Sequence, residues 1–244
     1  MSGKGVDLPL QSQTDAPIGG VVFDLDGTLI DSCADIAAAA NHCLANAGLP
    51  LRSEAQVRDY IGDGSRLLLQ RASGLSADDA RLDAMLQDFF AYYTEHAVDH
   101  TRLLPGARQV LEQLRHLPRA LCTNKPRVTT EAVLAALGIA GDFDAVVAAG
   151  DVPETKPHPA PLRRIAELLR VDCSRLVLVG DGPQDVLCAH AAGARSIGIS
   201  EALIVPLERL RAAQPEVLVA LGEVPSVIER WQREREPARR PRTP

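Results

Sequence analysis

The chain has 244 residues, of which 46% are hydrophobic and 24% charged, and its formal net charge is −6. This composition is typical of a globular protein with one domain, or with one domain and an insertion. No stretch reaches the roughly 20 apolar residues that a membrane-spanning helix needs. An acidic chain is also a poor match for nucleic acid, whose binding surfaces are basic.

Both ends of the chain are predicted to be flexible tails, over residues 1–17 and 229–244. The first has no apolar core of signal-peptide length. The second is basic and proline-rich, with six arginines and two glutamates between Arg230 and Pro244, and such tails are usually solvated. The five cysteines are scattered without a CxxC pair. This usage favours a reducing compartment, so we expect a cytoplasmic protein.

Short apolar runs alternate with helical stretches along most of the chain, which is the pattern of an α/β fold. We predict a doubly wound, Rossmann-like parallel sheet core made of residues 18–30 and 105–228. The predicted strands are Val21–Asp24, Arg119–Thr123, Ala145–Ala148, Leu176–Gly180 and Ser196–Ile199. The predicted core helices are Gly106–His116, Arg127–Leu137, Pro159–Leu169 and Gln184–Ala192.

The interval 31–104 breaks this alternation, because it contains no convincing strand. An alanine-rich helical stretch comes first, then the turn "GDGSR" leading into a helix. A long amphipathic helix follows, for which Ser76 is the expected N-cap. The sequence therefore predicts an inserted α-helical cap domain over residues 31–104.

The stretch "VVFDLDGT" places two carboxylates, Asp24 and Asp26, at the end of the first predicted strand. Alternate strand residues share a face, so both acids can point to one place, and Gly27 allows a sharp turn there. Two neighbouring ionised carboxylates repel each other, and hard oxygen ligands suit Mg²⁺. A lone pair of this kind is more often a solvated strand end.

Three further sites favour a real active site, because the carboxyl ends of parallel strands lie at one edge of the sheet. Thr123 and Asn124 end the second predicted strand in "LCTN", and Lys156 lies in the loop "ETKPHPAP". Asp181 and Asp185 follow another strand in "LVLVGDGPQD". Four ionised acids together would repel one another, and a Mg²⁺ ion with Lys156 would restore the balance.

These four motifs, "FDLDGT", "TNKP", "KPHPAPL" and "VGDGPQD", resemble in order those of the haloacid dehalogenase superfamily. The likeness extends from about Val21 to Ile228 and is greatest to phosphoglycolate phosphatases with a helical cap. It implies a Mg²⁺-dependent phosphatase that hydrolyses a small phosphorylated metabolite through an aspartyl phosphate. It implies neither a nucleic-acid nor a membrane partner, and it leaves the oligomeric state open.

The resemblance also implies roles for single residues. Asp24 matches the nucleophile, and Asp26 matches the acid that protonates the leaving oxygen and then activates water. Thr123 matches the hydroxyl that binds the transferring phosphoryl group, and Asn124 is expected to orient the substrate. Lys156 matches the cation that offsets charge on nucleophile and phosphate.

The expected metal ligands are Asp24, the backbone carbonyl of Asp26, and Asp181. Asp185 is expected to support the metal site directly or through water. In the cap turn, Arg66 is a candidate to grip a carboxylate or a second anionic group of the substrate, with an exposed helix residue as an equal alternative. The chain has only three lysines, and Lys125 is interpreted as a solvated loop residue.

Several other functions are open to the same motifs. Asp26 argues against a dehalogenase, and the absence of lysine from residues 31–104 argues against a phosphonate hydrolase with a Schiff-base lysine. A sugar-phosphate phosphatase or mutase of the same superfamily is the alternative, because a mutase has the same motifs and a similar cap. A phospho-accepting binding module would need an aspartyl phosphate that persists. The departures from the resemblance, Gly182-Pro183-Gln184 between the acids and no tyrosine-glycine turn after Ile199, leave the substrate open.

Overall fold

The computed structural model describes residues 17–201 and 204–234. The expected tail at residues 1–17 lies almost entirely outside this range, as does 235–244. Residues 229–233 are not a tail, however, because they belong to the helix α10 (Val224–Arg233). Trp231 is buried there and the Arg195 guanidinium lies over its ring, so apolar burial extends the fold beyond the predicted boundary.

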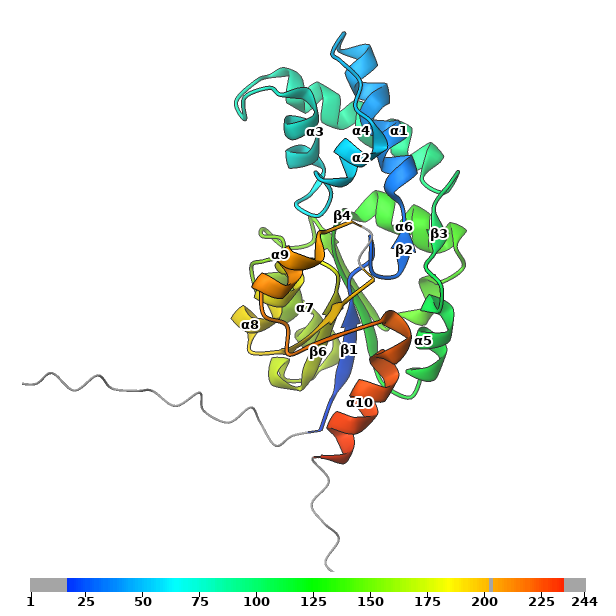
Figure 1. The fold of residues 1–244 in the computed structure, drawn as a ribbon, viewed down its shortest axis with the longest axis vertical. Helices are drawn as coiled ribbons and strands as arrows, with labels where there is room; N and C mark the ends of the chain where they lie inside the picture. Colours follow the sequence, from blue (N-terminus) through cyan, green and yellow to red (C-terminus); the bar gives the residue numbers. More distant parts are fainter. Residues whose placement is uncertain (1–16, 202–203, 235–244) are drawn as a thin grey trace, which may run out of the picture.

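The core is a six-stranded parallel sheet in the order β5-β4-β1-β6-β7-β8 (Figure 1). Its strands are β1 (Gly20–Phe23), β4 (Arg119–Pro126), β5 (Ala145–Ala149), β6 (Leu176–Gly180), β7 (Arg195–Ile199) and β8 (Val217–Val219). Five of them were predicted. β8 was missed, because three half-buried residues at a sheet edge give a weak apolar signal.

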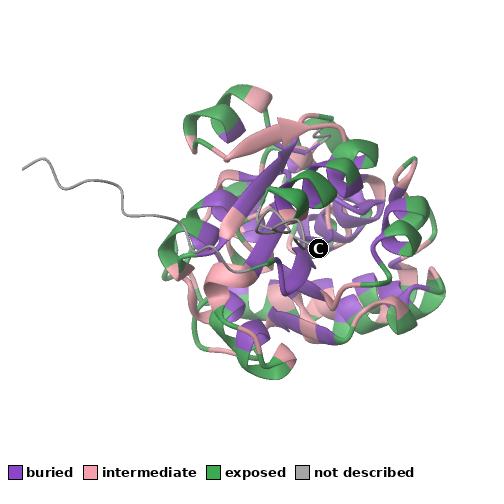
Figure 2. Cartoon of the chain, turned by 90° about the horizontal axis from the view of Figure 1, so that it is seen from below, coloured by how far each residue is buried: buried purple, intermediate pink, exposed green. Residues whose placement is uncertain are grey.

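Helices cover both faces of this sheet. One face packs α5 (Ala107–Gln113), α6 (Arg127–Ala136) and α10. The other packs α7 (Ala160–Leu169) and α8 (Pro183–Ala192). The smaller helix α9 (Leu207–Ala212) lies against α8. Figure 2 shows the buried strands enclosed by helices whose outer surfaces are exposed. Strands covered on both faces are continuously apolar, as in "GVVF" of β1.

The segment after β1 forms a separate group of helices above the sheet (Figure 1). It contains α1 (Cys33–Asn46), α2 (Glu54–Arg58), α3 (Ser65–Ser73) and α4 (Arg81–His96). We call these helices and the loops between them the cap. The cap is joined to the core by a short antiparallel ribbon of β2 (Ile30–Asp31) and β3 (Arg102–Leu103).

The long cap helix begins later than its sequence suggests. α4 starts at Arg81, with Ala80 at the N-cap position, whereas Ser76 was the predicted cap. Residues 76–79 form a separate turn in which the Asp79 amide donates to the Ser76 carbonyl. Asp79 then pairs with Arg81, so a local ion pair ends the turn before the helix begins.

No described helix has the length and apolar character that crossing a membrane requires.

Candidate active site

Three buried carboxylates meet at the carboxyl edge of the sheet. Asp24 follows β1, Asp181 follows β6, and Asp185 lies in the first turn of α8. One oxygen from each lies within 4.8 Å of the others, and all three residues are buried. The backbone holds the arrangement, because the Asp24 amide donates to the Val179 carbonyl. The sequence predicted that these three acids lie at one edge of the sheet, but it grouped Asp26 with them.

The Asp181 carboxylate has the features of a cation ligand. Its Oδ1 accepts a hydrogen bond from the Thr28 hydroxyl at 3.1 Å, whereas its buried Oδ2 has no partner among the described residues. Burial first, and the charges of Asp24 and Asp185 next, raise the pKa of Asp181 well above its ordinary value. A buried carboxylate oxygen without a partner is costly, and a divalent cation among these acids would remove that cost.

Gly27 makes the close approach to Asp181 possible. Its φ is +86°, and a Cβ atom added there would lie 2.3 Å from the Asp181 Oδ2 atom. Both the backbone conformation and the space therefore demand glycine. The residues present thus fit a hard divalent cation such as Mg²⁺, which oxygen ligands from Asp24 and Asp181 would hold, with Asp185 beside them.

Lys156 supplies a positive charge to the same cluster. Its Nζ atom lies 2.7 Å from Asp24 Oδ1 and 2.6 Å from Asp185 Oδ1, and it also donates to the Cys122 carbonyl. Burial alone would favour the neutral amine, but the Asp185 and Asp24 carboxylates hold the pKa of Lys156 well above its ordinary value. Burial first, and the charge of Asp185 next, raise the pKa of Asp24 to about 7, although Lys156 opposes the rise.

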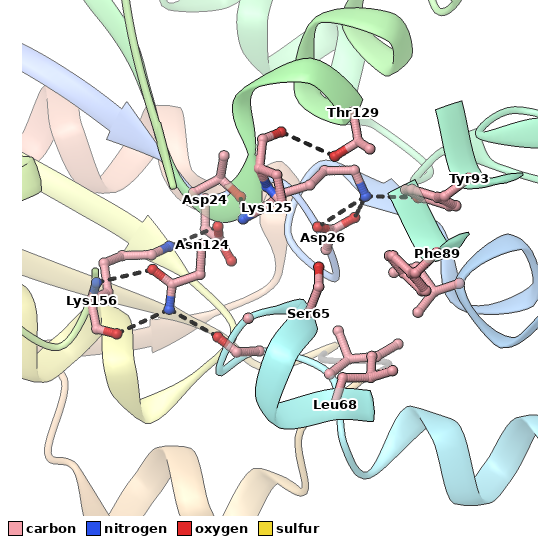
Figure 3. Close-up of a pocket in the computed structure, with 16 residues that line it drawn as sticks. Asp24, Asp26, Ser65, Leu68, Phe89, Tyr93, Asn124, Lys125, Thr129 and Lys156 are labelled. Carbon is pink, nitrogen blue, oxygen red and sulfur yellow. Dashed lines mark hydrogen bonds and ion pairs between the residues drawn. The ribbon is translucent and has the colours of Figure 1, made fainter. Parts of the chain in front are cut away.

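Asp26 lies outside this cluster although it is only two residues from Asp24. Its Oδ1 accepts hydrogen bonds from the Ser32 hydroxyl at 2.5 Å and from the Lys125 ammonium at 3.0 Å. Figure 3 shows that Asp26 lies on the side of the site that the cap covers. The two acids of the first motif therefore have different surroundings, one among acids and Lys156, the other between a hydroxyl and a second lysine.

The interpretation of Lys125 as a solvated loop lysine was wrong. The residue is 6% exposed, and its Nζ atom donates to the hydroxyl of Tyr93, a residue of cap helix α4, at 2.7 Å. Burial opposes its charge, but Asp26 and then Tyr93 hold the pKa of Lys125 above its ordinary value. Its contacts span 99 and 32 residues of sequence, so only its rarity and its place in "TNKP" could have pointed to it.

Thr123 and Asn124 lie in β4 beside these lysines. Thr123 lines the site and its hydroxyl accepts a hydrogen bond from the Lys125 amide. The Asn124 amide donates to the Lys156 carbonyl and to the Gly62 carbonyl in the cap, both at 2.9 Å. Its oxygen accepts from the Lys156 amide. Asn124 therefore fixes the Lys156 loop and connects the core to the cap.

A small cavity of about 50 Å³ lies between the core and the cap. The core contributes the charged and polar residues just described. The cap contributes mainly apolar groups, from Ile36, Ile61, Leu68, Phe89 and Tyr93, and the turn at Gly62, Gly64 and Ser65. Figure 3 shows Leu68 and Phe89 facing the polar residues. The cavity therefore has the acids and lysines on its core side and mainly apolar groups on its cap side.

Arg66 is not among the residues that line this cavity. Its guanidinium forms an ion pair with Asp83 of α4 and also reaches the Ala77 carbonyl, and about half of the side chain is exposed. In this structure Arg66 is therefore not in position to bind a substrate in the cavity, which was one of the two alternatives expected from the sequence. The turn that precedes it does face the cavity, through Gly64 and Ser65.

Comparisons with known proteins agree with this architecture. The family model described as haloacid dehalogenase-like hydrolase matches residues 21–199. A phosphoglycolate phosphatase of Pectobacterium atrosepticum is 35% identical over 207 residues, covering 83% of this chain and 88% of the relative. One from Neisseria meningitidis is 34% identical over 223 residues, covering 88% and 94%.

A solved structure shows the same fold. The crystal structure of a predicted phosphoglycolate phosphatase from Haemophilus somnus superposes with a TM-score of 0.79 at 28% identity. The match covers 89% of this chain and 99% of that one. Family model, relatives and fold agree over the core and the cap alike. The chain therefore belongs to the haloacid dehalogenase-like hydrolases, and it is an enzyme of the hydrolase class.

Proposed function

We propose that this enzyme hydrolyses 2-phosphoglycolate, a small phosphate monoester, through an aspartyl-phosphate intermediate and with Mg²⁺ as its metal. The substrate name comes from its relatives, which carry the name phosphoglycolate phosphatase at 32–40% identity. The observation that carries the mechanism is the separation of Asp24 from Asp26. Asp24 lies among acids and Lys156, whereas Asp26 faces the cavity under the cap.

Asp24 is the nucleophile in this proposal. One of its carboxylate oxygens forms a bond to phosphorus while the bond from phosphorus to the leaving oxygen breaks. Lys156 holds this carboxylate at 2.7 Å and offsets charge on the phosphoryl group. The Thr123 hydroxyl, at the edge of the same cavity, donates to a phosphoryl oxygen. Mg²⁺ held by Asp24, the Asp26 carbonyl and Asp181 would stabilise the negative charge that spreads over the phosphoryl oxygens.

Asp26 is the general acid of the first step and the general base of the second. In the first step it gives its proton to the leaving oxygen, so that glycolate departs as a neutral alcohol group. In the second step it takes a proton from water, whose oxygen attacks phosphorus and releases phosphate and the Asp24 carboxylate. The Ser32 and Lys125 donors stabilise Asp26 in the ionised form that it has between these two steps. The cap excludes other water from the intermediate.

The test is release of inorganic phosphate from 2-phosphoglycolate by the whole protein. We expect turnover with Mg²⁺, loss of turnover after chelation, and recovery when Mg²⁺ is restored. Sugar phosphates and ethyl phosphate, assayed in parallel, should have lower kcat/KM. Full activity after thorough chelation would contradict the metal, and a higher kcat/KM for a sugar phosphate would contradict the substrate.

A further inference from the structure

Lys125 pairs with one carboxylate among the described residues, whereas Lys156 pairs with two. The Lys156 ammonium has three N–H groups and three acceptors, on Asp24, Asp185 and Cys122. The Lys125 ammonium donates to the Tyr93 hydroxyl, and the one carboxylate that it contacts among the described residues is Asp26, whose two oxygens lie 3.0 and 3.4 Å away. The contact at 3.4 Å is the weakest of the three, so an N–H group of Lys125 can turn from it to a substrate. Both lysines line the cavity.

The cap side of the cavity offers no positive charge of its own. Of the described residues that line it, only the two lysines are cationic, and the cap residues are apolar or small. An ionised group enclosed under such a cap needs a charged partner, since burying it alone is very costly. The Lys156 charge is already committed to the carboxylate cluster. Among the described residues that line the cavity, Lys125 is therefore the cation whose charge is shared with a single carboxylate and that can pair a second anionic group on the substrate.

The position of Lys125 also suits the proposed substrate. Its Nζ atom is 3.0 Å from the carboxylate of Asp26, which protonates the leaving oxygen in the proposed mechanism. In 2-phosphoglycolate a single methylene separates that oxygen from the carboxylate carbon. With that oxygen at Asp26, the substrate carboxylate would reach the cap side of Asp26, where Figure 3 shows the Lys125 ammonium between Asp26 and Tyr93.

We propose that Lys125 is the specificity-determining residue that binds the carboxylate of the substrate, with Tyr93 of the cap holding its ammonium in place. The Tyr93 hydroxyl accepts from Nζ at 2.7 Å, and the ammonium lies 4.4 Å from the centre of the Tyr93 ring. Both contacts join α4 of the cap to β4 of the core. The selective cation is therefore fully oriented only when the cap covers the site. This assignment rests on the proposed function.

The test is the ratio of kcat/KM for 2-phosphoglycolate to kcat/KM for ethyl phosphate, which has a methyl group in place of the carboxylate. Lys125→Met should lower this ratio by at least about tenfold, because a charge-assisted hydrogen bond is lost for one substrate only. Arg66→Met removes a cation that follows the cap turn and pairs with Asp83 outside the cavity. It should leave the ratio unchanged.

Each outcome decides the assignment. Equal loss on both substrates in Lys125→Met would mean that Lys125 serves only Asp26, and a lower ratio in Arg66→Met alone would transfer the role to Arg66. If Lys125→Met does not fold, Tyr93→Phe replaces it, since the ring and the lysine charge remain. Its ratio should fall several-fold through KM, and an unchanged ratio would overturn the proposal. A wild-type enzyme active on ethyl phosphate but not on 2-phosphoglycolate would instead contradict the proposed substrate.

Discussion

The surroundings of Asp181 indicate that this residue serves a bound cation rather than the stability of the fold. Its buried Oδ2 atom, without a partner among the described residues, destabilises the metal-free folded protein, and its raised pKa means that the ionised carboxylate is disfavoured there. Asp181→Asn should therefore unfold at a higher temperature than wild type when metal is removed, by the equivalent of about 1–3 kcal/mol. It should gain no stability from Mg²⁺ and should lose most activity. Thermal unfolding with chelator and with Mg²⁺ measures both effects.

A matched control is Asp59→Asn, which changes an exposed acid at the end of α2. Its unfolding temperature should respond to Mg²⁺ as that of wild type does. A metal-free Asp181→Asn protein less stable than wild type would contradict the idea that the acid is maintained for the metal rather than for the fold.

The pH dependence of stability follows from Asp24. Burial raises its pKa from 3.8 to about 7, so in this range the metal-free folded state holds a proton that the unfolded state has lost. Stability of the metal-free protein should therefore fall as pH rises from about 4 to about 7. Mg²⁺ binds the ionised form, so the increase in unfolding temperature that it causes should be larger at pH 8 than at pH 5. An equal increase at both pH values would contradict this.

At the scale of elements, the turn after β1 is the most constrained. Gly27→Ala would put a methyl group 2.3 Å from the Asp181 carboxylate in a left-handed backbone conformation. It should cost more than the roughly 1 kcal/mol of backbone strain alone and abolish stabilisation by Mg²⁺. Gly48→Ala is the control, since its φ is +66° and nothing lies within 4 Å. Urea unfolding of both variants, with and without Mg²⁺, distinguishes backbone strain from the clash with Asp181. An equal loss of stability in the two variants would contradict the clash.

The sequence predicted elements where local patterns decide them. The apolar run Leu176–Gly180 is a strand as predicted, because burial on both faces leaves an unmistakable run. The start of α4 was misplaced because Ser76 looks like a cap in isolation, while the Asp79–Arg81 pair ends that turn. Lys125 was misread because its partners come from distant segments, and no local pattern records them.

The candidate site also contains residues that the sequence predicts and residues whose position depends on tertiary packing. Asp24 and Asp181 were predicted because strand ends in a parallel sheet meet at one edge, and Lys156 was predicted from the loop "ETKPHPAP". The structure brings the three residues together. Whether a residue of the cap turn faces the cavity depends instead on helix rotation. Arg66 points to Asp83 while its neighbour Ser65 lines the cavity, and the sequence does not distinguish the two.

For the whole molecule, the cap is the part that we expect to select the substrate. It leaves and rejoins the core through the β2–β3 ribbon, whose Asp31 and Arg102 are paired, so a short glycine linker can replace residues 32–101. The shortened protein should still hydrolyse a nitrophenyl phosphate slowly, because the acids belong to the core. Its preference for 2-phosphoglycolate over ethyl phosphate should disappear, as Tyr93 is lost. An unchanged preference in the kcat/KM ratio would show that the core alone selects.

The division of labour between Asp24 and Asp26 is the central claim, and rapid-quench labelling of Asp26→Asn tests it most directly. A nitrophenyl phosphate needs little protonation of its leaving group, so this variant should still be phosphorylated. Without the base it should stall before water attacks, with hydrolysis slowed by about 10²–10⁴-fold. Phosphate label should accumulate on Asp24, and Asp24→Asn should trap none. Label on Asp26 in the wild-type enzyme, or trapped label in Asp24→Asn, would contradict the account.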